Sequence, residues 1–179
     1  SLPAETNIIG NGFGGFVAGT LAIRHGHIFN KLILVDSGAG FPEAAKEPLR
    51  ILAKKATEGG MIEILEAAIK RMFPEEFIAA NPSVVATRKN QLAQADPALF
   101  ANAALGLTSL DNRPKLGDIG NPTLIVVGLA DETTPPALSY ELHAGIIGSE
   151  LIELPGVGHC PQLQDPRAFL GAVVPFLRS

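Results

Sequence analysis

Apolar residues gather in four short runs along the chain, and the stretches between them carry apolar positions at helical spacing. Residues 31–36 (K-L-I-L-V-D) and 122–128 (P-T-L-I-V-V-G) are the clearest runs, and such runs are typical of strands buried on both faces of a parallel sheet. Residues 6–10 and 150–154 predict one strand before and one strand after these two. The helices predicted between and after the strands cover residues 14–26, 134–145 and 165–177.

A long segment between the second and third predicted strands, residues 42–110, contains no run typical of a strand. The pairs Asn81-Pro82 and Asp96-Pro97 mark helix starts within it. Its apolar residues on one helical face include Met61, Leu65, Ala68, Ile69 and Met72. The pattern therefore predicts an α/β core formed by residues 1–41 and 111–179, with a mostly parallel sheet flanked by helices and an all-helical insertion between the two parts.

Composition narrows the classes of protein that fit this pattern. The 179 residues are 46% hydrophobic and 18% charged, so we expect a globular domain. The net charge of −4 and the absence of a basic block argue against a nucleic-acid partner, and the pairs Lys70-Arg71 and Arg88-Lys89 are interpreted as solvated helix faces. Cys160 is the only cysteine, which excludes an intrachain disulfide and suits a reducing cytoplasm. No apolar run is long enough to predict a membrane span.

The glycine-rich turn after the first predicted strand fits the outline of a dinucleotide-binding site. Gly10, Gly12 and Gly15 form G-x-G-x-x-G, and Asp36 follows at the end of the next strand. In such sites the glycines let the backbone approach a pyrophosphate, and the acidic residue binds the ribose. The N-terminal half alone would favour a nucleotide-binding oxidoreductase.

The same turn also fits the outline of a nucleophile elbow, G-x-S-x-G, with Gly10 and Gly14 as the outer glycines. That motif needs small residues two positions either side of the nucleophile, because the turn is crowded and strained. Gly12 stands where the serine would be and has no side chain with which to attack a carbonyl. A tight turn without any chemistry is a third interpretation, and the local motif leaves all three open.

Two polar residues in the C-terminal half favour the elbow. Asp131 follows the third predicted strand, and His159 lies in the loop after the fourth, 28 positions later. Carboxyl ends of parallel strands meet at one edge of a sheet, where α/β proteins gather their sites. The order of position 12, acid and histidine is the order of a nucleophile–acid–histidine triad.

Residues 6–41 together with 120–179 resemble the C-terminal part of the α/β-hydrolase fold, and within that superfamily they are similar to small enol-lactone hydrolases. The frame Gly10-Asn11-x-Phe13-Gly14-Gly15 also resembles the elbow of meta-cleavage-product hydrolases. Those enzymes carry an aromatic residue after the histidine, where this chain has Cys160, so the second resemblance is the weaker one. The insertion at 42–110 lies where the family has its lid.

The resemblance implies a role for each matching residue. Asp131 would orient His159, His159 would act as general base and acid, and the N–H of Phe13 would donate to the oxyanion. The implied substrates are small, largely apolar esters or lactones, and no cofactor or metal is implied. Because Gly12 replaces the nucleophile, we expect this chain to be inactive as it stands.

Other interpretations stay open at this stage. Asp36 is the reserve candidate for the acid, and Ser37 is the reserve candidate for a displaced nucleophile. A non-catalytic ligand-binding module of the same fold is the main alternative function, and the nucleotide-binding oxidoreductase is the weaker one. No grouping of histidine and acidic residues has metal-site spacing.

The start of the chain departs from the family pattern, because several strands precede the elbow in the family and only one does here. The family's second oxyanion donor comes from a loop in that missing part. We therefore expect either a partner segment that completes the sheet or a longer polypeptide of which this sequence is part.

Overall fold

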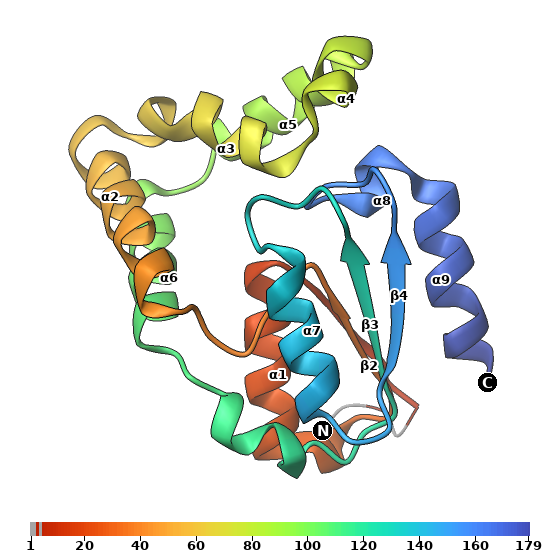
Figure 1. Cartoon of the computed structure of the whole chain (residues 1–179). Helices are drawn as coiled ribbons and strands as arrows, with labels where there is room; N and C mark the ends of the chain where they lie inside the picture. The colour runs from red at the N-terminus through yellow and green to blue at the C-terminus, as the bar shows by residue number, and fades with distance from the viewer. Residues whose placement is uncertain (1–2, 4) are drawn as a thin grey trace.

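The computed structural model describes residue 3 and residues 5–179, and its four strands form one parallel sheet. The strands are β1 (Ile8–Asn11), β2 (Leu32–Val35), β3 (Thr123–Gly128) and β4 (Glu150–Leu154), and they lie side by side in chain order. All three neighbouring pairs are parallel, as the continuous apolar runs predict. The carboxyl ends of the four strands therefore meet at one edge of the sheet (Figure 1).

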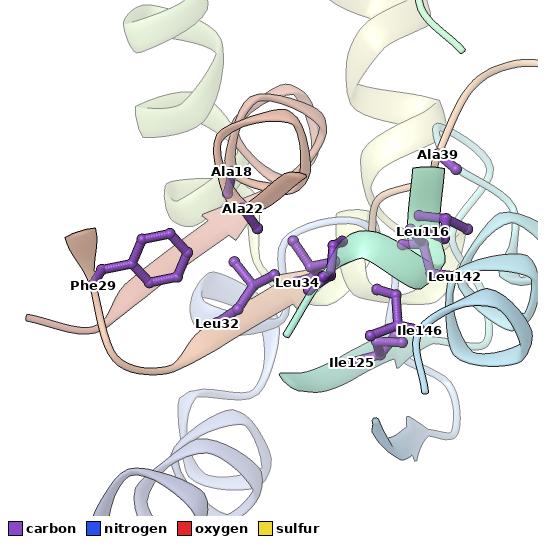
Figure 2. Packing of buried hydrophobic residues seen from close by; sticks show 11 residues of the cluster. Ala18, Ala22, Phe29, Leu32, Leu34, Ala39, Leu116, Ile125, Leu142 and Ile146 are labelled. Atoms are coloured by element: carbon purple, nitrogen blue, oxygen red, sulfur yellow. The ribbon is translucent and has the colours of Figure 1, made fainter. Parts of the chain in front are cut away.

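Helices cover both faces of this sheet, which confirms the predicted α/β class. The flanking helices are α1 (Phe13–His25), α7 (Pro136–Gly145) and α9 (Pro166–Arg178). Leu32, Leu34 and Ile125 point to the face covered by α1 and α7, where they pack against Ala22 and Leu142 (Figure 2). The alternate residues Ile33, Val35, Leu124 and Val126 pack against Ala172, Val173 and Phe176 of α9 on the other face. The two central strands, β2 and β3, are thus apolar on both sides, as a central strand of a parallel sheet requires.

Between β2 and β3 the chain is helical, with no strand from residue 43 to residue 109. The helices are α2 (Glu43–Gly59), α3 (Leu65–Met72), α4 (Glu75–Ala80), α5 (Pro82–Ala93) and α6 (Pro97–Ser109), with the 3₁₀ helix η2 (Met61–Ile64) between α2 and α3. The two ends of this segment meet at an antiparallel bridge between Gly40 and Asp111. In Figure 1, α3, α4 and α5 lie beyond the carboxyl ends of the strands.

Asp-Pro pairs begin two of the helices, as the sequence predicts. Asp96 precedes α6 and Asp165 precedes α9. In the first helical turn the Asp96 carboxylate accepts two backbone N–H groups and the Asp165 carboxylate accepts one. Proline fits the first helical position because its missing N–H would have no partner there. Three short 3₁₀ or α-helical turns fall outside the predicted elements: η1 (Gly26–Ile28), η3 (Arg113–Asp118) and α8 (Pro161–Gln164).

The outer edge of β1 has no partner strand among the residues that the structure describes. The side chain of Ile9 on this strand is 47% exposed. An open, apolar edge strand readily pairs with a further strand. No helix within the described part of the chain is long and apolar enough to cross a bilayer.

Candidate functional site

The turn from β1 into α1 is centred on Gly12. Its φ of 55° lies in the left-handed region, which favours glycine because side chains clash with the backbone there. The Gly12 N–H donates to the Val35 carbonyl at 3.0 Å, and its carbonyl accepts the Gly15 N–H at 2.9 Å. The turn is therefore held both to the neighbouring strand and to the helix that follows.

The glycines around this turn differ in whether a larger residue would fit in their place. A Cβ on Gly10 would collide with the backbone of Gly14, and a Cβ on Gly15 would collide with the Ser37 hydroxyl. Around Gly14 there is free space for a side chain. The expectation that crowding requires a small residue at position 14 is therefore wrong for this turn, whereas it holds for positions 10 and 15.

His159 and Asp131 lie together at the carboxyl edge of the sheet. The imidazole Nδ1 is 2.8 Å from Asp131 Oδ2, and both side chains are buried. The other carboxylate oxygen of Asp131 accepts the backbone N–H groups of Thr133 at 2.7 Å and Thr134 at 3.1 Å. A buried carboxylate held by this many donors fits the role of orienting an imidazole and stabilising its protonated form.

The second ring nitrogen of His159 faces the turn at Gly12. A Cβ built on Gly12 would stand 2.6 Å from His159 Nε2 and 2.9 Å from Cε1. The structure thus brings together the three positions that the chain order predicts for a triad, with the imidazole in the space of the side chain that Gly12 lacks.

Three further contacts fix the histidine loop. The N–H of His159 donates to the Met72 carbonyl at 2.8 Å. The Asn11 side chain donates to the His159 carbonyl at 3.0 Å, and its own oxygen accepts from Gln162 at 3.2 Å. The loop is therefore held by α3 on one side and by the residue before Gly12 on the other.

The first N–H groups of α1 point toward the same place. Within the described chain, the N–H groups of Phe13 and Gly14 have no acceptor. The N-terminal end of a helix carries a partial positive charge and free donors, which suits a developing oxyanion. The predicted donor at Phe13 is thus free to act.

A cavity of about 350 Å³ opens beside His159, between the sheet edge and the helical segment. Most of its lining is apolar and comes from the helices and the loop before them, with Phe41, Leu49, Leu65, Met72, Leu92 and Leu107 among the lining residues. Asn11, Thr133 and Thr134 contribute polar atoms at the sheet edge. The arrangement provides an apolar compartment with reactive groups at one end, which is the usual form of a small-molecule site.

Two arginines also line this cavity, contrary to the interpretation of their dibasic pairs as solvated faces. Arg71 donates to the carbonyls of Glu132 at 3.0 Å and Thr133 at 3.3 Å. The Nε of Arg88 is buried and has no partner in the described part of the chain. Their neighbours Lys70 and Lys89 give no hint of this, because only the packing of α3 and α5 over the sheet edge decides which side chain turns inward.

The reserve candidates lie near the pair without contacting the imidazole by a hydrogen bond. Asp36 is fully buried and accepts the Gly128 N–H at 2.7 Å. Burial raises the pKa of the Asp36 carboxyl from 3.8 to about 8, against the Gly128 hydrogen bond and with a further contribution from Asp131. Ser37 donates to the Gly12 carbonyl at 3.1 Å and is buried beneath the turn. Neither residue is among those that line the cavity beside His159.

Burial raises the pKa of the Cys160 thiol to about 11, so this side chain is a packed apolar group rather than a nucleophile. Over residue 3 and residues 5–179, no three histidine, cysteine or acidic side chains are grouped so that they could hold a metal ion.

Comparisons with known proteins identify the family of this chain. Residues 2–172 match the model of the alpha/beta hydrolase family. The chain is 30% identical over 169 residues to 3-oxoadipate enol-lactonase 2 of Acinetobacter baylyi, a match that covers 94% of this chain and 62% of the relative. It is 28% identical over 183 residues to the 2-hydroxy-6-oxononadienedioate/2-hydroxy-6-oxononatrienedioate hydrolase of Paraburkholderia xenovorans, covering 97% of this chain and 62% of that protein.

Solved structures give the same result. The enol-lactonase from Burkholderia xenovorans superposes with a TM-score of 0.91 at 27% identity, covering 98% of this chain and 66% of that one. The chain thus spans less than two thirds of the length of these relatives. The comparisons favour the hydrolase interpretation of the glycine turn over the nucleotide-binding one. With its parallel sheet, its elbow turn and its match over residues 2–172, the chain belongs to the alpha/beta hydrolase family.

Proposed function

We propose that this chain carries the His–Asp part of a hydrolase site for small esters or lactones, with residue 12 as the nucleophile position. The observation that carries the proposal is the position of His159, whose Nδ1 is bonded to Asp131 while its Nε2 faces Gly12. Once the ring has moved back to make room for a side chain at position 12, an imidazole in this orientation would remove a proton from a nucleophile there and be stabilised by a carboxylate on its other side.

With a serine at position 12, the chemistry runs in two steps. His159 takes the hydroxyl proton as the oxygen attacks the substrate carbonyl, the Phe13 N–H donates to the oxyanion, and the imidazolium returns the proton to the leaving alcohol. Water then repeats the sequence on the acyl-enzyme and releases the acid. With Gly12 the first bond cannot form, so this chain holds its substrate without covalent turnover.

Arg88 refines the expected substrate from a largely apolar compound to one that also carries an anionic group. Its buried Nε lacks an acceptor, and a ligand carboxylate in the cavity would supply one. The names of two relatives, a 3-oxoadipate enol-lactonase and a hydrolase of a 2-hydroxy-6-oxo dioate, also describe carboxylate-bearing compounds. We therefore propose a small ester or lactone that carries a carboxylate.

The test is Gly12→Ser, made in this chain and assayed with p-nitrophenyl esters. We expect ester hydrolysis with an initial burst of nitrophenol, and we expect the double variant with His159→Gln to lose it. A folded Gly12→Ser chain with no burst and no turnover would overturn the proposal.

A binding module without catalysis is the second candidate, because Gly12 itself removes the nucleophile. Ligand-dependent thermal stabilisation of the Gly12 chain, with no turnover after Gly12→Ser, would favour it. Our proposal expects stabilisation before that substitution and turnover after it.

The proposal extends to the helical segment over the site and to the open edge of the sheet. We propose that residues 42–110 act as the lid over the site, because α3 and α5 contribute to the cavity wall. We propose that a further strand, from a partner segment or from a preceding part of the polypeptide, pairs with the open edge of β1. The cytoplasmic location stays a prediction that rests on the single cysteine.

A further inference from the structure

Thr134 contacts both members of the His159–Asp131 pair. Its Oγ1 is 2.7 Å from Asp131 Oδ2 and 3.1 Å from His159 Nδ1, and it is also 2.7 Å from the backbone carbonyl oxygen of Asp36. The Thr134 side chain is buried. We propose that Thr134 is a positioning residue that accepts the Nδ1–H of His159 while donating its own proton to the Asp36 carbonyl, and thereby holds the ring with Nε2 toward Gly12.

The direction of the Thr134 hydroxyl follows from counting donors and acceptors. The hydroxyl has one hydrogen and two acceptors at the same distance, Asp131 Oδ2 and the Asp36 carbonyl. Asp131 already accepts from His159 and from two backbone N–H groups. Within the described chain, the buried Asp36 carbonyl has no donor other than Thr134. Donation to Asp36 gives this carbonyl its partner, whereas donation to Asp131 would leave the carbonyl without one, so donation to Asp36 costs less free energy.

The proton position on His159 then follows. When the Thr134 hydroxyl donates to the Asp36 carbonyl, the Thr134 oxygen presents a lone pair to His159 Nδ1. The Asp131 carboxylate presents a second acceptor to the same nitrogen. A ring nitrogen that faces two acceptors carries the hydrogen, so the lone pair of the neutral ring lies on Nε2. This is the nitrogen that faces Gly12, and it is the one that a base needs free.

The backbone of Asp36 explains how its carbonyl comes to face Thr134. Asp36 is the one described non-glycine residue with a positive φ, at 46°, a conformation that costs free energy. Its carboxyl group bonds the Gly128 N–H, which anchors the strained residue between the ends of β2 and β3. Asp36 thus supports Thr134 instead of serving as the acid itself. The other titratable groups around the ring are the Asp36 carboxyl, the Cys160 thiol, and the Arg71 and Arg88 guanidinium groups.

The experiment identifies the protonated ring nitrogen of His159 and measures how fast its proton exchanges, and it needs no substrate. This inference rests on the proposed function only in taking His159 as the base. In the ¹⁵N-labelled chain with Gly12 unchanged, long-range ¹H–¹⁵N spectra identify which ring nitrogen is protonated, and saturation transfer gives the exchange rate of that proton. Thr134→Val removes the hydroxyl at constant shape, Thr134→Ser restores it, and Thr133→Val is the matched control. Thr133 has a buried hydroxyl with no partner, so its removal breaks no bond.

We expect a single Nδ1–H form in the unchanged chain, and an exchange rate about five to ten times faster in Thr134→Val, the effect of losing one buried hydrogen bond. Thr134→Ser and Thr133→Val should stay within about twofold of the unchanged chain. If Thr134→Val does not fold, Thr134→Ala is held to the same criterion. An unchanged rate in the folded Thr134 variant, or an equal increase in Thr133→Val, would overturn the inference. Absence of ester hydrolysis by Gly12→Ser, with the Thr134 effect present, would overturn the proposed function alone.

Discussion

The imidazole of His159 fills the space that a side chain at Gly12 would take, with Nε2 only 2.6 Å from the Cβ position. Carbon and nitrogen atoms do not approach this closely without a bond, so any residue larger than glycine must move the ring. The ring is held on its far side by Asp131 and in its loop by Met72, and both contacts resist such a movement. The position that needs a nucleophile for covalent chemistry is therefore also one where a side chain has a structural cost.

Gly12→Ala should destabilise the fold by about 1–3 kcal/mol, because the alanine adopts a left-handed φ and displaces His159. Urea denaturation measures the change. Gly14→Ala is the matched control, since the space around Gly14 is free and alanine favours a helix by about 0.5–1 kcal/mol. Equal stability of Gly12→Ala and the unchanged chain would show that the His159 ring moves aside without cost. The inference that this ring resists a side chain at position 12 would then be wrong.

Asp36 should make the protein less stable as the pH rises from about 4 to 8. Its folded pKa of about 8 lies above the ordinary 3.8, so in this window the folded state holds a proton that the unfolded state releases. The free energy of unfolding then falls with rising pH, by about 1.4 kcal/mol per pH unit at most for one group. Asp36→Asn keeps an acceptor for Gly128 and should flatten this dependence and raise stability at pH 8.

Urea denaturation at several pH values between 5 and 8 checks this, with the exposed Asp118→Asn as control. The control should keep the slope of the unchanged chain. An Asp36→Asn protein with the same slope would mean that Asp36 is ionised in the fold.

Much of this fold follows from the sequence because buried parallel strands need continuous apolar runs, which residues 31–36 and 122–128 display. Asp131 and His159 could be predicted from the sequence for a related reason, since each follows a strand and parallel strands end at one edge. The roles of Thr134 and Arg88 could not be predicted in this way. Thr134 acts through a backbone carbonyl brought beside it by β2, and Arg88 acts through the face of α5 that packs over the cavity. Both are properties of packing between distant segments, which no local spacing encodes.

Arg88→Met should weaken binding of a carboxylate ligand by about 10- to 100-fold, the effect of losing a charge-assisted hydrogen bond. Pentanoate and methyl pentanoate are suitable probes, because they differ only in the anionic group. Isothermal titration should show the loss for pentanoate and little change for the methyl ester. Lys89→Met is the control, since Lys89 pairs with Glu66 away from the cavity lining. Equal weakening of both probes would assign Arg88 to packing instead of anion recognition.

Arg71 should hold the end of α3 to the loop that carries Asp131. Its guanidinium group donates to the carbonyls of Glu132 and Thr133, and the Glu132 N–H donates back to the Arg71 carbonyl at 3.3 Å. Arg71→Gln shortens the side chain and removes the fork that reaches both carbonyls. We expect faster amide exchange in residues 131–134 by about fivefold, with the sheet strands unchanged, because these solvent-exposed and partly buried bonds to a charged group together contribute about 1 kcal/mol.

Hydrogen–deuterium exchange with mass spectrometry checks this loop directly. The neighbouring Lys70→Gln is the control, since the Lys70 residue is exposed on the same helix. Because the Asp131 loop also sets the direction of His159, Arg71→Gln in a Gly12→Ser background should lower kcat more than it raises KM. A uniform increase in exchange over the whole sheet would show that Arg71 stabilises the fold as a whole, and its link to the acid loop would then have no separate role.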